Sequence, residues 1–477
     1  MGSQRPVLYC LLAFLLLCGA SLAAPPRYGY LSASVDSVIA SRAQVQCYDP
    51  NTYEAPASGN KLTIRPSCGR VERDILVHDR ARLRTVRERS SSSSAMPPVP
   101  AIPIPPFIPP TPGPAPAEAP SATIPDHTGT NLKTPEFVVV VGFGSPAQTS
   151  ATMFDTGSDL SWIQCQPCSG HCYKQHDPVF DPAKSSSYAV VPCGTTECAA
   201  AGGECNGTTC VYGVEYGDGS STTGVLARET LTFSSSSEFT GFIFGCGETN
   251  LGDFGEVDGL LGLGRGSLSL SSQAAPAFGG IFSYCLPSYN TTPGYLSIGA
   301  TPVTGQIPVQ YTAMVNKPDY PSFYFIELVS INIGGYVLPV PPSEFTKTGT
   351  LLDSGTILTY LPPPAYTALR DRFKFTMQGS KPAPPYDELD TCYDFTGQSG
   401  ILIPGVSFNF SDGAVFNLNF FGIMTFPDDT KPAVGCLAFV SRPADMPFSV
   451  VGSTTQRSAE VIYDVPAQKI GFIPASC

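Results

Sequence analysis

Two short motifs that contain an aspartate occur in different halves of the 477-residue chain. Asp155 lies in Met-Phe-Asp-Thr-Gly-Ser (153–158), and Asp353 lies in Leu-Leu-Asp-Ser-Gly-Thr (351–356). A glycine two residues after the aspartate favours a tight turn, where the backbone comes close and water is scarce. Either motif alone is typical of a simple type I turn. Their repetition predicts two similar lobes that each contribute one aspartate.

A second repeat supports this duplication. Leu260-Leu261-Gly262 follows the first aspartate, and Val450-Val451-Gly452 follows the second at a similar distance. If the two halves pack about a pseudo-two-fold axis, the carboxylates face each other and share one proton. One could then act as a general base on a water molecule while its protonated partner polarises a scissile carbonyl.

Hydroxyl side chains adjoin both aspartates. We expect those of Thr156 and Ser354 to bridge the two loops, and those of Ser158 and Thr356 to hold the carboxylates by hydrogen bonds. A serine or cysteine hydrolase would need a histidine base. Of the four histidines, two are in or next to the N-terminal segment and two in a cysteine-rich stretch, so a histidine-based triad is not favoured.

A hairpin is predicted where the alternating run 211–216 enters the turn Gly217-Asp218-Gly219. At its end, Tyr216 could be an ordinary strand aromatic. Trp162, the only tryptophan, could be a core residue.

Taken together, these motifs resemble the pepsin-like aspartic endopeptidases, specifically the nepenthesin-type plant branch, over about residues 134–477. The resemblance implies a mostly β, bilobal fold with pseudo-two-fold related lobes and an active-site cleft between them. It assigns the catalytic dyad to Asp155 and Asp353 and needs no cofactor or metal. It also implies a flap and substrate-binding set in which Trp162 supports the flap tyrosine: Tyr216, Gly217, Asp218, Gly157, Gly355 and Trp162.

Short apolar runs broken by glycine and small polar residues predict a mostly β body after residue 134. The predicted strands are 137–141, 211–216, 230–233, 242–244, 323–328, 331–333, 450–451 and 461–463. Helical spacing of leucine and alanine predicts helices over 267–277 and 363–377.

The N-terminus predicts export, because an apolar run and small residues precede an expected cleavage after Ala23. An exported chain favours disulfides over zinc, although the spacing near His171 and His176 also permits a zinc site. Six disulfides are expected among Cys165, Cys168, Cys172, Cys193, Cys198, Cys205, Cys210, Cys246, Cys285, Cys392, Cys436 and Cys477. Candidate glycosylation sites are Asn206, Asn290 and Asn409.

The remaining N-terminal region differs in character from the body. A basic stretch over 70–89, with the pattern of a short amphipathic helix, precedes a proline-rich linker over 97–120. We expect a cationic pro-segment that lies against the acidic body, although a merely solvated basic stretch is the alternative. The expected units are a signal peptide (1–23), a pro-segment (24–130), and lobes over 131–310 and 311–477.

The formal net charge of -12 argues against a nucleic-acid partner. We therefore predict a secreted aspartic endopeptidase, made as a zymogen, that acts on proteins or peptides as a monomer, without a membrane anchor after signal removal. The apoplast or cell wall is the expected destination, and the vacuole is an alternative. The competing hypothesis is a catalytically inactive protein of the same fold that inhibits cell-wall-degrading glycosidases, since fold alone does not settle function.

Overall fold

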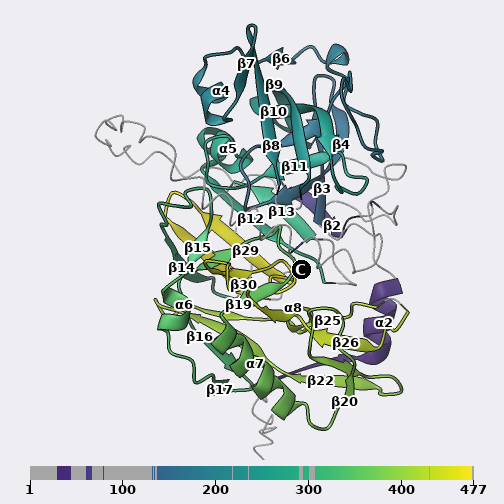
Figure 1. Cartoon of the computed structure of the whole chain (residues 1–477), viewed down its shortest axis with the longest axis vertical. Coiled ribbons are helices and arrows are strands. Elements are labelled where there is room, and N and C mark those ends of the chain that lie inside the picture. Colours follow the sequence, from purple (N-terminus) through teal and green to yellow (C-terminus); the bar gives the residue numbers. More distant parts are fainter. Residues whose placement is uncertain are drawn as a thin grey trace, which may run out of the picture.

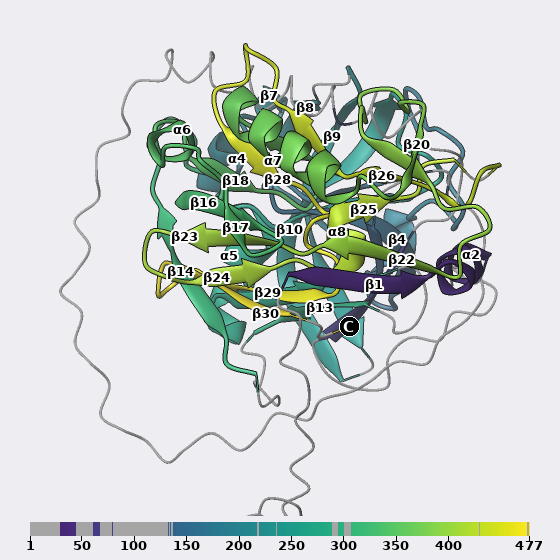
Figure 2. The ribbon, with the colours of Figure 1, turned by 90° about the horizontal axis from the view of Figure 1, so that it is seen from below.

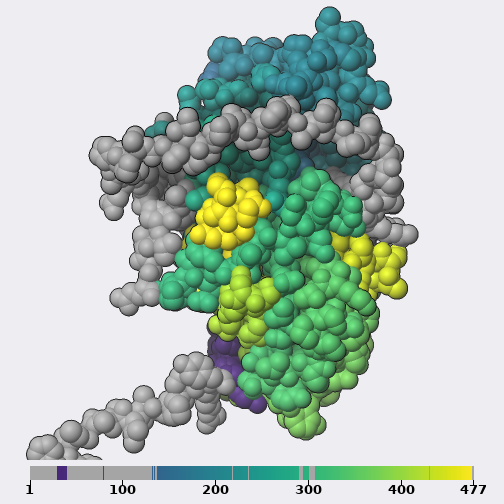
Figure 3. Space-filling model, turned by 90° about the vertical axis from the view of Figure 1, so that its left-hand side faces the viewer, coloured from purple at the N-terminus to yellow at the C-terminus, as the bar shows by residue number. Residues whose placement is uncertain are grey.

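The computed structural model describes residues 29–43, 61–66, 79, 132, 134, 137–216, 219–234, 236–288, 294–299, 307–428, 430–474 and 477. The predicted signal peptide, the proline-rich linker and all of the basic stretch except Asp79 lie outside these residues. Figure 1 shows two β-rich bodies, an upper one in blue and teal and a lower one in green, and Figure 3 shows them in space-filling form. The predicted mostly β, bilobal class is confirmed.

The elements before residue 300 build the first lobe and the segment that precedes it. They are β1 (Tyr30–Ser34), α2 (Val35–Ala43), β2 (Lys61–Pro66), β3 (Phe137–Phe143), β4 (Gln148–Asp155), β5 (Trp162–Gln164), the 3-10 helix η2 (Pro182–Lys184), β6 (Ala189–Val190), α4 (Thr196–Ala200), β7 (Glu204–Asn206), β8 (Thr209–Glu215), β9 (Ser221–Ser234), β10 (Ser237–Leu251), β11 (Gly259–Gly262), α5 (Leu270–Phe278), β12 (Ile281–Cys285) and β13 (Gly294–Ile298).

The second lobe has more and shorter strands. Its elements are β14 (Gln310–Val315), β15 (Phe325–Ile326), β16 (Leu328–Ile333), β17 (Tyr336–Val337), α6 (Ser343–Thr346), β18 (Thr350–Leu352), β19 (Thr359–Leu361), α7 (Pro363–Thr376), β20 (Lys381–Ala383), β21 (Cys392–Asp394), β22 (Gly400–Pro404), β23 (Val406–Phe410), β24 (Val415–Asn417), α8 (Phe420–Ile423), β25 (Met424–Thr425), β26 (Val434–Leu437), β27 (Phe439–Ser441), β28 (Ser449–Val451), β29 (Ala459–Asp464) and β30 (Lys469–Pro474).

Most predicted elements are present with shifted ends. The first predicted helix begins later, at Leu270, because the Ser269 hydroxyl accepts from the Ser272 amide and caps it; Gly279, with φ 84°, ends it. The second is α7, which ends one residue before the predicted boundary. The predicted strand 323–328 is divided between β15 and β16.

The two lobes share one antiparallel sheet. Its strand order is β2, β13, β12, β29, β30 and β14, and the direct junction between the lobes is the pairing of β12 with β29. The first three strands come from before residue 300 and the last three from after it. This arrangement gives the pseudo-two-fold relation that the repeated motifs predicted.

The N-terminal segment is part of both lobes' sheets. The strand β2 pairs with β13 through residues 61–64 and with β3 through residues 65–66. The strand β1 pairs along its whole length with β22, as Figure 2 shows at the lower side of the second lobe. These contacts are made by backbone hydrogen bonds, whereas the basic stretch that we expect to lie against the acidic body is outside the described residues apart from Asp79.

Six disulfides join the twelve cysteines after residue 164, as expected. The pairs are Cys165–Cys246, Cys168–Cys172, Cys193–Cys205, Cys198–Cys210, Cys285–Cys477 and Cys392–Cys436. The cysteines of the candidate zinc motif are therefore all bonded to other cysteines. In the described part of the chain, no helix is long and apolar enough to span a membrane.

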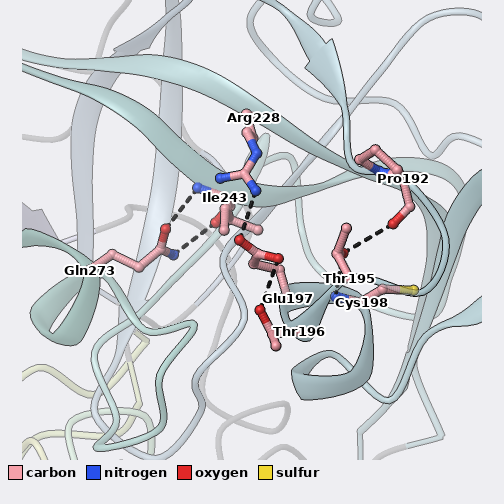
Figure 4. Close-up of polar contacts among 8 residues, drawn as sticks. All are labelled: Pro192, Thr195, Thr196, Glu197, Cys198, Arg228, Ile243 and Gln273. Carbon is pink, nitrogen blue, oxygen red and sulfur yellow. Dashed lines mark hydrogen bonds and ion pairs between the residues drawn. The ribbon is translucent and has the colours of Figure 1, made fainter.

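The cysteine-rich insert, residues 165–210, also makes polar contacts with the rest of the lobe, which Figure 4 shows. Thr195 caps α4 by accepting from the Cys198 amide, and Glu197 pairs with Arg228 of β9 at 2.7 Å. Nearby, Gln273 of α5 makes two hydrogen bonds to the backbone of Ile243 in β10. Its Oε1 accepts from the Ile243 amide at 2.8 Å, and its Nε2 donates to the Ile243 carbonyl at 2.9 Å. These contacts attach the insert and α5 to the long hairpin of β9 and β10.

Candidate active site

Asp155 is the last residue of β4 and is 2% exposed. This strand runs parallel to β11, with Asp155 opposite Gly262, and the Leu263 amide donates to the Asp155 carbonyl at 2.8 Å. The apolar run before Asp155 is buried because it forms an inner strand, paired with β3 on one side and β11 on the other. The motif therefore places an acid directly after a buried strand.

Asp353 has the equivalent position in the second lobe and is 0% exposed. It follows β18, which runs parallel to β28, and its amide donates to the Val451 carbonyl at 3.2 Å. The two Leu/Val-Gly repeats are thus the strands that lie beside the two aspartate loops. Their spacing in the sequence is explained by this shared parallel pairing.

The glycines that end these repeats are required by close backbone approach. A Cβ atom on Gly262 would lie 2.3 Å from the Asp159 carbonyl oxygen, and one on Gly452 would lie 2.2 Å from the Leu358 carbonyl oxygen. Both distances are too short for any side chain. Each glycine allows the aspartate loop to cross directly over the neighbouring strand.

The two aspartate loops contact each other through reciprocal hydrogen bonds. The Thr156 amide donates to Ser354 Oγ at 3.1 Å, and the Ser354 amide donates to Thr156 Oγ1 at 2.9 Å. All four groups are buried. The structure therefore brings the two predicted loops together, and the hydroxyls of Thr156 and Ser354 bridge them.

The two carboxylates are held differently. Asp155 Oδ1 accepts from the Gly157 amide at 2.8 Å. Asp353 Oδ1 accepts from the Gly355 amide at 3.2 Å, and its Oδ2 accepts from the Thr356 hydroxyl at 2.6 Å. The amides of both glycines thus orient the acids, which goes beyond the substrate-binding role that we predicted for these residues.

Ser158 differs from its counterpart Thr356. Its hydroxyl is buried and makes no hydrogen bond within the described residues, so the predicted support of Asp155 by Ser158 is not found. The backbone of this residue is held, since the Ser158 carbonyl accepts from the Gly264 amide at 2.8 Å. The twofold similarity of the sequence motifs is broken at this position.

A buried polar cluster that contacts the backbone of the Asp353 loop was not predicted. Gln456 Nε2 donates to the carbonyls of Asp353 at 3.2 Å and Val451 at 2.9 Å. Its Oε1 accepts from the Tyr284 hydroxyl, which lies 3.0 Å from the Tyr463 hydroxyl. Burial raises the pKa of Tyr463 well above its usual value, so this phenol stays neutral. A lone glutamine or tyrosine in a sequence carries no signal for such a role.

The predicted hairpin is formed by β8 and β9. Tyr216 lies directly after β8, and its hydroxyl accepts from Trp162 Nε1 at 2.7 Å. Both rings pack against Phe254, with ring centroids 5.9 Å and 4.9 Å away. The contact expected between Trp162 and the flap tyrosine is present, whereas Gly217 and Asp218 lie outside the described residues.

The candidate glycosylation sites have unequal surroundings. Asn206 is exposed on β7, while Asn290 lies outside the described residues. Asn409 is only partly exposed, in β23, and its Nδ2 donates to the Ser330 hydroxyl at 3.1 Å. Since this nitrogen is the atom that a glycan would modify, the geometry favours Asn206 over Asn409.

Comparison with known proteins agrees with the fold. Family models described as xylanase inhibitor N-terminal and xylanase inhibitor C-terminal match residues 137–300 and 323–474. An aspartyl protease family protein of Arabidopsis thaliana is 42% identical over 76% of this chain and 76% of its own length. Aspartic proteinase nepenthesin-2 of Nepenthes gracilis is 37% identical, over 72% and 78%.

Among solved structures, conglutin gamma, a basic 7S globulin from lupine seeds, aligns with a TM-score of 0.57 and 21% identity, covering 71% of this chain and 91% of that chain. The buried pair of aspartate loops and the two-lobed β fold define a protein of the pepsin type. The chain belongs to the pepsin-like aspartic protease family.

Proposed function

We propose that this protein is an aspartic endopeptidase that hydrolyses peptide bonds with a water molecule activated by Asp155 and Asp353. The observation that carries the proposal is the reciprocal hydrogen bonding of the two loops, at 3.1 Å and 2.9 Å, with an aspartate next to each bridging residue. In this arrangement, one carboxylate acts as the general base towards water. The other, protonated, donates to the carbonyl oxygen of the substrate, and no covalent intermediate is formed.

Extended polypeptides are the proposed substrates. The hairpin of β8 and β9 would cover the bound peptide, with Tyr216 held by the Trp162 indole. Secretion and synthesis as a zymogen belong to the same proposal. They are supported by the apolar N-terminus and by the disulfides, which form and persist in oxidising compartments.

The competing function is inhibition of a glycosidase without catalysis. It is favoured by the description of the two family models as xylanase inhibitor domains. Against it, both aspartates are retained, and each accepts hydrogen bonds from its own loop.

Proteolysis of a denatured protein at acidic pH distinguishes the two functions. We expect the purified protein to cut denatured casein, pepstatin to block the reaction, and Asp155→Asn or Asp353→Asn to reduce the rate at least a thousandfold. Equal hydrolysis by wild type and Asp155→Asn would contradict the role of the dyad. Inhibition of a xylanase by both wild type and Asp155→Asn, with no proteolysis by either, would favour the binder.

A further inference from the structure

Asp79 is a residue of the N-terminal segment that is completely buried in the second lobe, with 0% exposure. Its Oδ1 accepts from the Ile357 amide at 2.6 Å, and its Oδ2 accepts from the Leu358 amide at 2.7 Å. The Tyr360 hydroxyl adds a longer contact to Oδ2, at 3.3 Å. One carboxylate thus bridges two consecutive amides from a part of the chain about 280 residues away.

These amides belong to the loop that carries Asp353. Ile357 directly follows Thr356, whose hydroxyl donates to the Asp353 carboxylate. The same stretch is fixed from its other side, since the Thr356 carbonyl accepts from the Ser453 amide at 2.6 Å and the Ile357 carbonyl from the Thr454 amide at 3.0 Å. The carbonyls therefore face the lobe's own backbone, and the amides face Asp79.

A carboxylate matches this geometry better than other side chains do. Its two oxygens are both acceptors, and each takes one of the two amides. Successive backbone amides that point in one direction form an anion-binding concavity. Hydrogen bonds to a charged acceptor are stronger than those between neutral groups, and a carboxylate is buried only where such bonds replace water.

The segment that carries Asp79 is attached to the body on its N-terminal side as well. β1 pairs with β22 of the second lobe, and β2 pairs with β13 and then with β3. Because these strands hold the segment on the body, Asp79 reaches its partners as an intramolecular ligand. Its local concentration is then far above that of a free peptide in solution.

We propose that the amides of Ile357 and Leu358, with the Tyr360 hydroxyl, form a carboxylate-binding site whose occupant in the full chain is Asp79. Occupancy of this site holds the N-terminal segment against the Asp353 loop and keeps a substrate peptide from it. Asp79 is therefore an autoinhibitory anchor. The inhibitory part of this inference rests on the proposed protease function, whereas the binding part does not.

The binding part is tested by amide exchange in the full-length chain, with Asp155→Asn added to prevent self-cleavage. We compare Asp79→Asn and Asp79→Ala with Asp74→Asn, which removes another acid of the same segment. Exchange at Ile357 and Leu358 should become at least tenfold faster in the Asp79 variants, while the strand amides of Leu261 and Val451 stay protected. Unchanged exchange at Ile357 and Leu358 in Asp79→Ala would overturn the inference.

If both Asp79 variants lose protection throughout the chain, the comparison is made with Tyr360→Phe, which removes one donor of the site and leaves the packing of the ring. Faster exchange confined to Ile357 and Leu358 would then support the site, and exchange equal to wild type would overturn it.

The inhibitory part is tested with the catalytically intact full chain. Asp79→Asn should raise the initial rate of casein hydrolysis at least tenfold over wild type, and Asp74→Asn should not. Equal initial rates in Asp79→Asn and wild type would overturn the autoinhibitory role. Absence of hydrolysis in every variant would contradict the proposed protease function, while the exchange measurement would still decide whether Asp79 is bound.

Discussion

At the scale of single residues, four hydroxyl side chains follow the two aspartates, and three of them make hydrogen bonds to the opposite loop or to a carboxylate. Thr156 and Ser354 join the loops, and Thr356 holds Asp353. The fourth, Ser158, makes no hydrogen bond within the described residues. The chemical similarity of two motifs therefore does not guarantee equal roles.

Replacement of Ser354 by alanine should be much more harmful than replacement of Ser158. The first change leaves the buried amide of Thr156 without its acceptor, which costs about 1–3 kcal/mol of stability. The second removes a buried hydroxyl that has no partner, so we expect a change within about 0.5 kcal/mol. Urea unfolding of the two variants measures both values, and equal losses would contradict the assignment.

Gln456 is expected to position Asp353 through its backbone. Gln456→Met keeps the length of the side chain but removes both hydrogen bonds to the carbonyls of Asp353 and Val451. Because the carbonyl of Asp353, which we propose as a catalytic residue, is released, kcat on a peptide substrate should fall about tenfold or more while KM changes little. An unchanged kcat would show that the loop holds its geometry without this contact.

At the scale of elements, each aspartate loop depends on a strand that ends in glycine. Gly452→Ala should destabilise the protein by more than about 3 kcal/mol, because its Cβ would lie 2.2 Å from the Leu358 carbonyl oxygen. Gly379→Ala is the matched control, since nothing lies within 4 Å of its added Cβ. Thermal unfolding of both variants makes the comparison, and similar melting temperatures would contradict the steric explanation.

The elements that could be predicted from the sequence are those with a local signal. The apolar runs before Asp155 and Asp353, the turn after Tyr216 and the leucine spacing of α7 all depend on neighbouring residues. The pairing of β1 with β22 had no such signal, because backbone hydrogen bonds between distant strands depend on the assembled lobe. The contact of Asp79 with Ile357 and Leu358 was missed for the same reason.

At the scale of the whole molecule, a buried acid and a partly exposed acid make stability depend on pH in opposite directions. Burial, with repulsion from Asp177, raises the pKa of Asp258 well above its usual value. A pair with Arg228 lowers the pKa of Glu197 to about 2. The stability that Glu197 contributes is thus present above the pKa that this group has in the unfolded chain, and it is lost as the pH falls towards 2. The stability linked to Asp258 is instead present at acidic pH.

Asp258→Asn should therefore make the stability less sensitive to pH. The folded pKa of Asp258 lies above its unfolded value of about 4, so its contribution is full below about pH 4 and is lost as the pH rises through the folded value. The variant should gain stability relative to wild type at pH 7 but not at pH 4. Melting temperatures at both pH values test this, and an equal difference at the two values would contradict it.

At this scale, two features could not be predicted from the sequence: the pairing of the disulfides and the polar contacts behind the Asp353 loop. The number of bridges followed from the even count of cysteines, but their pairing did not, because 165–246 and 285–477 join residues that are distant in the sequence. Likewise, the repeat predicted that two loops meet, whereas the polar cluster of Gln456, Tyr284 and Tyr463 required the shared sheet to bring β12 and β29 together.

The position of β2 has a consequence for any version of this protein that is shortened or cleaved. A cut between Pro66 and Phe137 breaks the polypeptide but leaves residues 61–66 hydrogen-bonded to β13 and β3. Because no disulfide among the cysteines after residue 164 reaches this strand, the two fragments should stay together in native conditions and separate on denaturation. A recombinant chain that starts at Phe137 would lack this strand, and the unpaired edges of β13 and β3 would favour association with other copies.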